Sequence, residues 1–92
     1  LAGHLLEICR GSKLGATVRF ADIPLIAEAG AWAEEGVATG ASDRNWASYG
    51  AEVELPAEFP PVQCAILTDP QTSGGLLVAC APAAAEAVLA LF

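Results

Sequence analysis

Glycine and proline divide this chain into short segments, which limits the length of any helix or strand. Nine glycines and six prolines are spread over 92 residues, and both residue types are unfavourable inside regular elements. Gly11 and Gly36 are expected to end helices, and Pro82 to begin one. A chain of this length buries roughly two thirds of the surface that its unfolded form exposes. A single small domain over residues 1–92 is therefore predicted.

The spacing of apolar residues between these breaks predicts several helices. We expect helices over residues 2–10, from Asp22 and Pro24 to Gly36, and over residues 82–91, with a turn of helix begun by Ser42 or Asp43. Residues 62–68 fit either a strand or a short buried helix, and the helix is preferred because a proline stands at its first turn.

Three further segments have the patterns of strands. Residues 16–20 and 51–55 alternate apolar and polar side chains, and residues 76–80 form a continuous apolar run that suits a strand buried on both faces. Helices and strands in this order predict an α+β fold, a mixed sheet covered by helices. The aromatic residues expected to anchor its core are Trp32, Trp46 and Tyr49.

Charge and hydropathy exclude several classes of protein. Eleven acidic and four basic residues give a net charge of −7, which repels the phosphate backbone of nucleic acids. The apolar tail over residues 76–92 is interrupted by Pro82 and Glu86, so a membrane span is not expected. The opening residues have no pattern of a secretory signal, and a cytoplasmic protein is predicted.

The three cysteines, Cys9, Cys64 and Cys80, are odd in number and have no CxxC spacing. Their apolar neighbours indicate buried thiols. His4 is the only histidine and has no spaced nucleophile or carboxylate to partner it, so a capping or surface role is expected for it. No metal site and no catalytic constellation are predicted within the chain.

The segment TDPQTSGG at residues 68–75 is the most polar stretch of this apolar chain. Its hydroxyl groups and paired glycines suit a phosphate group or another ligand that approaches the backbone closely. It lacks the lysine of a P-loop and the GxGxxG pattern. The alternative is an ordinary loop in which Asp69 and Thr72 bond to the local backbone, and the residues alone favour it.

A second polar cluster spans residues 39–45. Arg44 is one of only four cations in the chain that could meet an anionic ligand. In the alternative, Ser42 and Asn45 cap exposed amides of a turn, and Arg44 offsets nearby carboxylates.

The sequence resembles the selenophosphate synthetase (selenide, water dikinase) family. LTDPQTSGGLLVACAP followed by an alanine-rich helix is similar to the closing part of that family. The opening GHLLEICRGSKLGATVRFADIPLI and the segment GASDRNWASYG also resemble it. The likeness spans essentially the whole chain, and residues 69–75 are its most specific part.

The resemblance implies a domain of the aminoimidazole ribonucleotide synthetase-like ATP enzymes, truncated at both ends. The reaction implied for the whole enzyme converts ATP, selenide and water to selenophosphate, AMP and phosphate, with magnesium. The amino-terminal ATP-binding domain, which brings the reactive cysteine, the lysine and the magnesium-binding aspartates, is not present, so this fragment is expected to need no cofactor and to be inactive alone. The resemblance suggests a face turned toward that missing domain, formed by Gly3, His4, Arg44, Asn45, Thr68, Asp69, Gln71, Thr72, Ser73, Gly74 and Gly75.

Truncation is expected to leave sheet edges and apolar surface uncovered, so self-association of the isolated chain, as a dimer or through an exchanged element, is also expected. The alternative function is a stand-alone module that binds a protein partner or a small ligand through its acidic surface and the TDPQTSGG segment.

Overall fold

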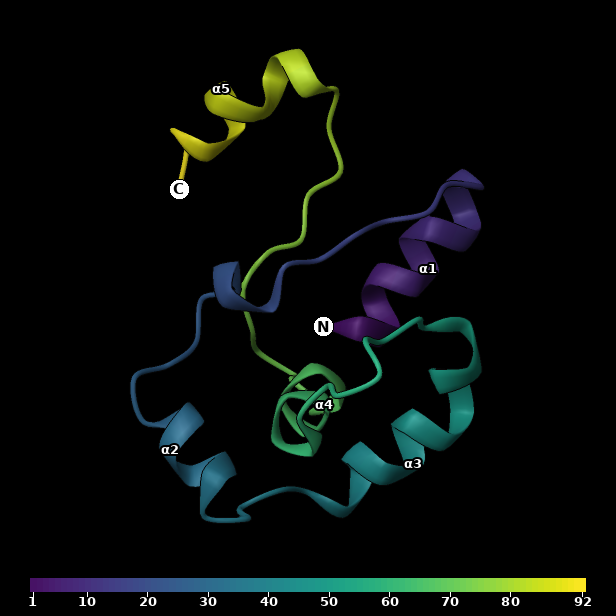
Figure 1. Ribbon diagram of the computed structural model, residues 1–92. Coiled ribbons are helices and arrows are strands. Elements are labelled where there is room, and N and C mark those ends of the chain that lie inside the picture. Colours follow the sequence, from purple (N-terminus) through teal and green to yellow (C-terminus); the bar gives the residue numbers. More distant parts are fainter.

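Helix α4 (Pro61–Thr68) lies at the centre of the computed structural model, which describes residues 1–92, and three other helices contact it (Figure 1). Pro60 stands at the N-cap of α4 and Pro61 is its first residue. Proline has no backbone N–H, and none is needed for helical hydrogen bonding at this position. The helix preferred for residues 62–68 is thus confirmed. The remaining elements are α1 (Ala2–Ser12), η1 (Phe20–Asp22), α2 (Ala29–Glu34), α3 (Gly40–Tyr49), η2 (Gly50–Glu52), η3 (Pro82–Ala84) and α5 (Ala85–Leu89), where η denotes a 3-10 turn.

The predicted α+β fold with a mixed sheet is wrong, because the structure contains helices and no strand. Residues 16–19, 53–55 and 76–80 run as irregular segments. Arg19 and Val53 do have extended backbone angles, with φ −91°, ψ 113° and φ −110°, ψ 120°. A strand also requires a hydrogen-bonded neighbour, and alternation of side chains says nothing about whether that neighbour is present.

Several helix ends differ from their predicted positions. Helix α1 passes through Gly11 and ends at Ser12. The next residue, Lys13, takes a left-handed conformation (φ 58°) and its backbone N–H donates to the Cys9 carbonyl. The predicted helix from Pro24 is helical only from Ala29, although Gly36 follows its end with φ 84° as expected. The single turn expected near Ser42 is the ten-residue helix α3.

The apolar residues do not assemble into a closed core. The two residues that are fully buried, Ser42 and Thr68, are both polar. The accessible surface is 7163 Å², whereas a folded chain of 9.3 kDa typically exposes about 5,000 Å². The radius of gyration is 14.1 Å, against about 12 Å for a compact domain of this length. This chain therefore presents a large surface that could be covered by other polypeptide.

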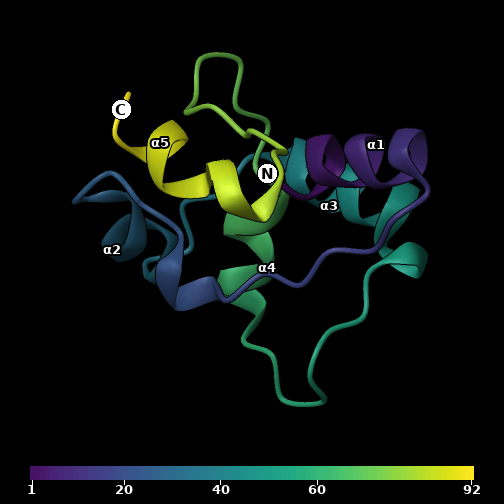
Figure 2. The same ribbon diagram turned by 90° about the horizontal axis from the view of Figure 1, so that it is seen from above.

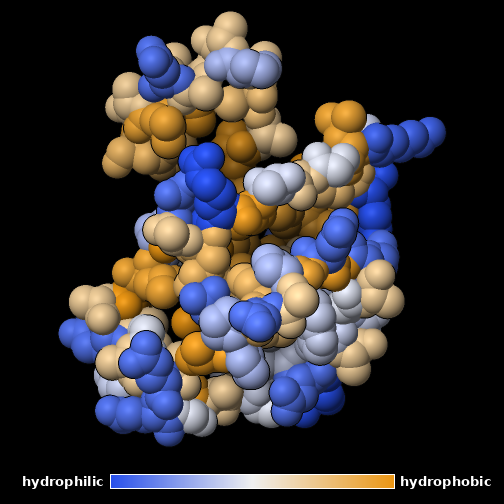
Figure 3. All heavy atoms as spheres, viewed as in Figure 1, coloured by the Kyte–Doolittle hydropathy of each residue, from blue (hydrophilic) through white to orange (hydrophobic).

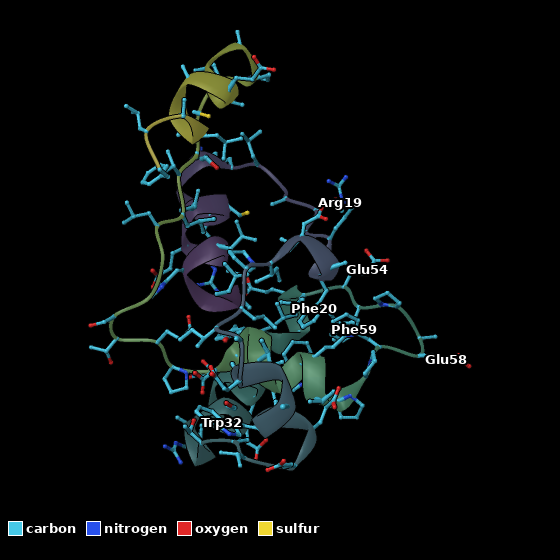
Figure 4. All side chains as sticks on the ribbon, turned by 90° about the vertical axis from the view of Figure 1, so that its left-hand side faces the viewer. Arg19, Phe20, Trp32, Glu54, Glu58 and Phe59 are labelled. Carbon is cyan, nitrogen blue, oxygen red and sulfur yellow. The ribbon has the colours of Figure 1, made fainter.

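Two groups of expected core residues are more exposed than predicted. Trp32 is 54% exposed and lies at the edge of the molecule in Figure 4, while Trp46 and Tyr49 are half-buried. Of the three thiols expected to be buried, Cys9 and Cys64 are half-buried and Cys80 is exposed. Their apolar neighbours in sequence are themselves mostly accessible, so an apolar neighbourhood did not imply burial.

One aromatic contact joins the irregular segments to the body. The rings of Phe20 and Phe59 meet edge to face, with centroids 6.0 Å apart and planes at 81° (Figure 4), a favoured geometry for an aromatic pair. It connects η1 to the segment that leads into α4.

Residues 76–92, which we call the C-terminal arm, stand away from the other helices. Figure 1 shows α5 separated from α1 to α4, and its main contact is with the adjoining η3. Exposed apolar residues of the arm are Leu76, Leu77, Val78, Leu89, Leu91 and Phe92. In Figure 3 the α5 end of the arm forms a lobe with hydrophobic residues on the side that faces the body. No helix of the chain has the length and apolar character needed to cross a membrane.

Candidate ligand-facing hollow

The polar loop, residues 69–75, begins where α4 is forced to end. Asp69 precedes Pro70, and the ring of a proline disfavours helical angles in the residue before it. Asp69 accordingly has φ −56° and ψ 129°. Residues 70–75 are exposed, and the loop, light green in Figure 2, projects beyond the helices. The backbone of this loop is thus open to an approaching molecule.

The last four carbonyl groups of α4, which no helix can satisfy internally, all accept hydrogen bonds. The Thr68 hydroxyl donates to Ala65 O (3.2 Å), as well as to Cys64 O (2.9 Å). The Asp69 amide donates to Ile66 O at 3.4 Å. The remaining two donors lie outside α4: Leu1 N, immediately before α1, donates to Leu67 O at 3.2 Å, and Asn45 Nδ2 on α3 donates to Thr68 O at 2.8 Å. Helices α1 and α3 therefore hold the base of the polar loop.

Helices α1 and α3 also meet each other directly beside that base. A Cβ atom on Gly3 would lie 3.2 Å from Cε1 of Tyr49, so glycine at this position allows the Tyr49 ring to approach α1 closely. Burial raises the pKa of the Tyr49 hydroxyl, and the nearby Gly3 backbone opposes that rise. Asn45 and Tyr49 are one turn apart on α3, so the same helix face contacts α4 and α1.

The polar loop, α1 and α3 surround one open hollow of about 1520 Å³. Ten of the eleven residues named from the sequence line it, from three separate parts of the chain. They are Gly3, His4, Asn45, Thr68, Asp69, Gln71, Thr72, Ser73, Gly74 and Gly75. The structure thus brings these residues together. That they bind a ligand stays a prediction.

Arg44 is the residue that the structure does not bring to the hollow. It is exposed on α3, and its Nη1 lies 3.6 Å from the position of a Cβ on Gly40, one turn back along the same helix. Asn45, the next residue of the helix, lines the hollow, whereas Arg44 does not.

Two arginines that the sequence analysis did not select line the hollow instead, Arg10 and Arg19. Both are already paired with carboxylates. Arg10 bonds to Glu52, with Nε 3.1 Å from Oε2, and this pairing holds the pKa of Glu52 below its ordinary value. Arg19 Nε lies 2.5 Å from Asp22 Oδ2. No motif in the sequence marks these cations. Arg10 lies on α1, and Arg19 reaches the hollow because the segment after α1 passes beside it.

Comparison with known proteins places the whole chain in one family. Residues 1–92 match the model described as AIR synthase related protein, C-terminal domain. The chain belongs to this family. No solved structure matches the chain.

Curated relatives agree over the full length of the chain. It is 56% identical over 92 residues to a selenide, water dikinase of Paraburkholderia xenovorans. The identity is 58% with the enzyme of Burkholderia ambifaria and 51% with that of Pseudomonas straminea, again over 92 residues. All 92 residues are covered, but they span only 26% of each relative. The predicted relationship to the C-terminal domain of selenide, water dikinases is therefore confirmed.

Proposed function

We propose that this chain serves as the C-terminal domain of a selenide, water dikinase and that its hollow faces the ATP-binding part of that enzyme. The observation that carries the proposal is the gathering of His4, Asn45 and the polar loop around one open hollow. These residues come from distant parts of the sequence, and the loop among them is exposed. In the complete enzyme, ATP, selenide and water would give selenophosphate, AMP and phosphate.

Magnesium and the phosphates of ATP do not fit the residues of this chain alone. The chain contains no group of three His, Cys, Asp or Glu side chains arranged to hold a metal ion. Both arginines of the hollow are paired with carboxylates, and Glu7, Asp22 and Asp69 line it as well. Phosphoryl transfer depends on neutralising and positioning the phosphates. The proposal therefore assigns these tasks to polypeptide outside residues 1–92, and turnover by the chain alone is not expected.

A chimeric enzyme tests this proposal. The chain would replace the matching 92 residues of the Paraburkholderia xenovorans relative, and selenide-dependent release of AMP and formation of selenophosphate would be measured. We expect activity within about tenfold of the parent, which corresponds to a rise of less than about 1.4 kcal/mol in the activation barrier, and no turnover by the isolated chain.

Variants of the chimera separate the hollow from the rest of the surface. Replacing Thr72 and Ser73 together by alanine should lower kcat/KM at least about tenfold, because two hydroxyls that line the hollow are removed. Glu58→Gln, which lies outside the hollow and projects from the body in Figure 4, is the matched control. A folded chimera without activity would contradict the proposal.

The second candidate, a stand-alone binding module, is favoured by one observation, the exposed apolar residues of the C-terminal arm. Surfaces of this kind commonly mark contacts between proteins. A folded but inactive chimera would favour this candidate.

A cytoplasmic location is also part of the proposal. All three cysteines are free, and unpaired thiols are typical of reducing compartments.

A further inference from the structure

We propose that Asn45 is a positioning residue, which sets the direction of the polar loop by capping the end of α4 from a neighbouring helix. Its Nδ2 donates a hydrogen bond of 2.8 Å to the carbonyl oxygen of Thr68. The polar loop starts at the next residue, Asp69. A single side chain of α3 thus holds the last carbonyl group before the loop.

The Thr68 carbonyl depends on this bond because solvent barely reaches Thr68 in the folded chain. Thr68 is 2% exposed, and a buried carbonyl group without a partner is strongly unfavourable. The bond to Asn45 is the one that the Thr68 oxygen accepts. If it is lost, the end of α4 must turn to expose the carbonyl group. The loop, whose first residues are the rigid pair Asp69-Pro70, must then change direction with it.

From its place in the sequence, Asn45 was expected either to contact a ligand or to cap its own turn. The structure assigns its amide to a carbonyl group 23 residues away, while α3 begins without any side-chain cap. Asn45 lines the hollow and holds the loop that lines the same hollow. The importance of that loop for catalysis rests on the proposed function, but its position in the isolated chain does not.

Nuclear magnetic resonance of the 92-residue chain tests the bond directly. In the wild-type chain, a scalar coupling across the hydrogen bond is expected between Nδ2 of Asn45 and the carbonyl carbon of Thr68. In Asn45→Ala, the amide hydrogens of Thr68 and Asp69 should exchange at least about tenfold faster, and the residual dipolar couplings of residues 70–75 should change.

Asn45→Asp distinguishes a hydrogen bond from simple packing. A carboxylate has no donor for the Thr68 carbonyl, whereas a protonated carboxyl group has one. The variant should therefore resemble Asn45→Ala at neutral pH and regain slow exchange when acid protonates the introduced carboxyl group, after correction for intrinsic rates. The wild-type chain at each pH is the reference, because His4, Glu7, Asp22 and Asp69 also line the hollow and can titrate.

Arg44→Ala is the matched control, since Arg44 precedes Asn45 on the same helix, is exposed and does not line the hollow; it should leave exchange at the end of α4 unchanged. Unaltered exchange in Asn45→Asp at neutral pH, no recovery in acid, or no coupling in the wild-type chain would each overturn the inference. If the Asn45→Ala chain does not fold, the inference is still tested by the scalar coupling in the wild-type chain and by amide exchange in Asn45→Asp at neutral and at acid pH. An inactive chimera together with these expected spectra would contradict the proposed function alone.

Discussion

Two buried hydroxyl groups, one on α3 and one on α4, differ in whether they have a hydrogen-bond partner. Thr68 and Ser42 are the two fully buried residues of the chain. The Thr68 hydroxyl bonds to two carbonyl groups of its own helix. The Ser42 hydroxyl is buried on α3 with no hydrogen-bond partner. A buried hydroxyl without a partner costs free energy relative to a methyl group.

We therefore expect Ser42→Ala to stabilise the chain. The free energy of unfolding in urea should rise by about 1 kcal/mol, because the substitution removes an unsatisfied polar group and alanine is the better helix former. Ser48→Ala, on the exposed side of α3, controls for helix propensity alone. An equal gain in the two variants, or a loss in Ser42→Ala, would mean that the Ser42 hydroxyl has a favourable contact.

At the scale of elements, two glycines in helical conformation predict opposite responses to alanine. A Cβ on Gly50 would lie only 2.7 Å from Cδ2 and Cε2 of Trp46, against the indole ring, whereas nothing lies within 4 Å of a Cβ on Gly11. Gly50 thus permits the junction of α3 and η2 to pack against its own tryptophan. At Gly11 no neighbouring atom requires a glycine, so this residue lowers the stability of α1 without a steric benefit.

Gly50→Ala should lower the free energy of unfolding by about 1–3 kcal/mol, because the indole must move to accommodate the methyl group. Gly11→Ala should raise it by up to about 1 kcal/mol through helix propensity. Urea denaturation followed by circular dichroism measures both, and tryptophan emission should shift only in Gly50→Ala. Destabilisation of the same size in both variants would contradict the steric explanation.

The ion pair between Arg10 and Glu52 connects α1 to η2, and it predicts a dependence on pH. The hydrogen bond from Arg10 lowers the pKa of Glu52, so the native state binds this proton less tightly than the unfolded state. The pair's contribution to stability is therefore complete above the ordinary pKa of a glutamate and is lost as pH falls through the lowered value.

Glu52→Gln should consequently be slightly less stable than the wild-type chain at neutral pH, and the difference should vanish in acid and shrink in high salt. Thermal unfolding across pH measures it. Glu58→Gln is the control, since Glu58 is exposed and forms no ion pair. A difference between Glu52→Gln and wild type that persists in acid would show that Glu52 acts through something other than its charge.

At the scale of the whole molecule, exposed apolar surface is the dominant feature. The accessible surface exceeds that of a typical folded chain of this mass by about 2,000 Å², and a standard protein interface takes about 800 Å² from each partner. A second open hollow of about 1010 Å³ between α1 and residues 13–20 and 52–59 is lined mostly by hydrophobic residues. The C-terminal arm adds Leu89, Leu91 and Phe92.

The isolated chain is therefore expected to self-associate. Light scattering at millimolar concentration should give a mass of at least two chains, and added salt should strengthen the association by screening the net charge of −7. Leu89→Glu and Phe92→Glu together should weaken it, whereas Glu58→Gln should not. A monomer at all concentrations would contradict the expectation.

The sequence alone determined the family, through residues 69–75 and the segments at 3–26 and 40–50, and it located most of the helices. It also selected ten residues that lie together around one hollow. Local signals suffice for these results, because prolines, glycines and apolar spacing act over a few residues and a motif keeps its residue types wherever it lies. These local signals did not predict that α1 continues to Ser12 or that α3 extends from Gly40 to Tyr49.

The packing of the folded chain sets whether the extended segments pair, which thiols and tryptophans are covered, and what Asn45 contacts. The patterns at residues 16–20, 51–55 and 76–80 describe faces of a strand, but a sheet exists only where a second strand supplies the hydrogen bonds. Asn45 reaches Thr68 across 23 residues, and Arg44, the residue before it, lies outside the hollow. Contacts between distant residues depend on how helices pack, which no local pattern records.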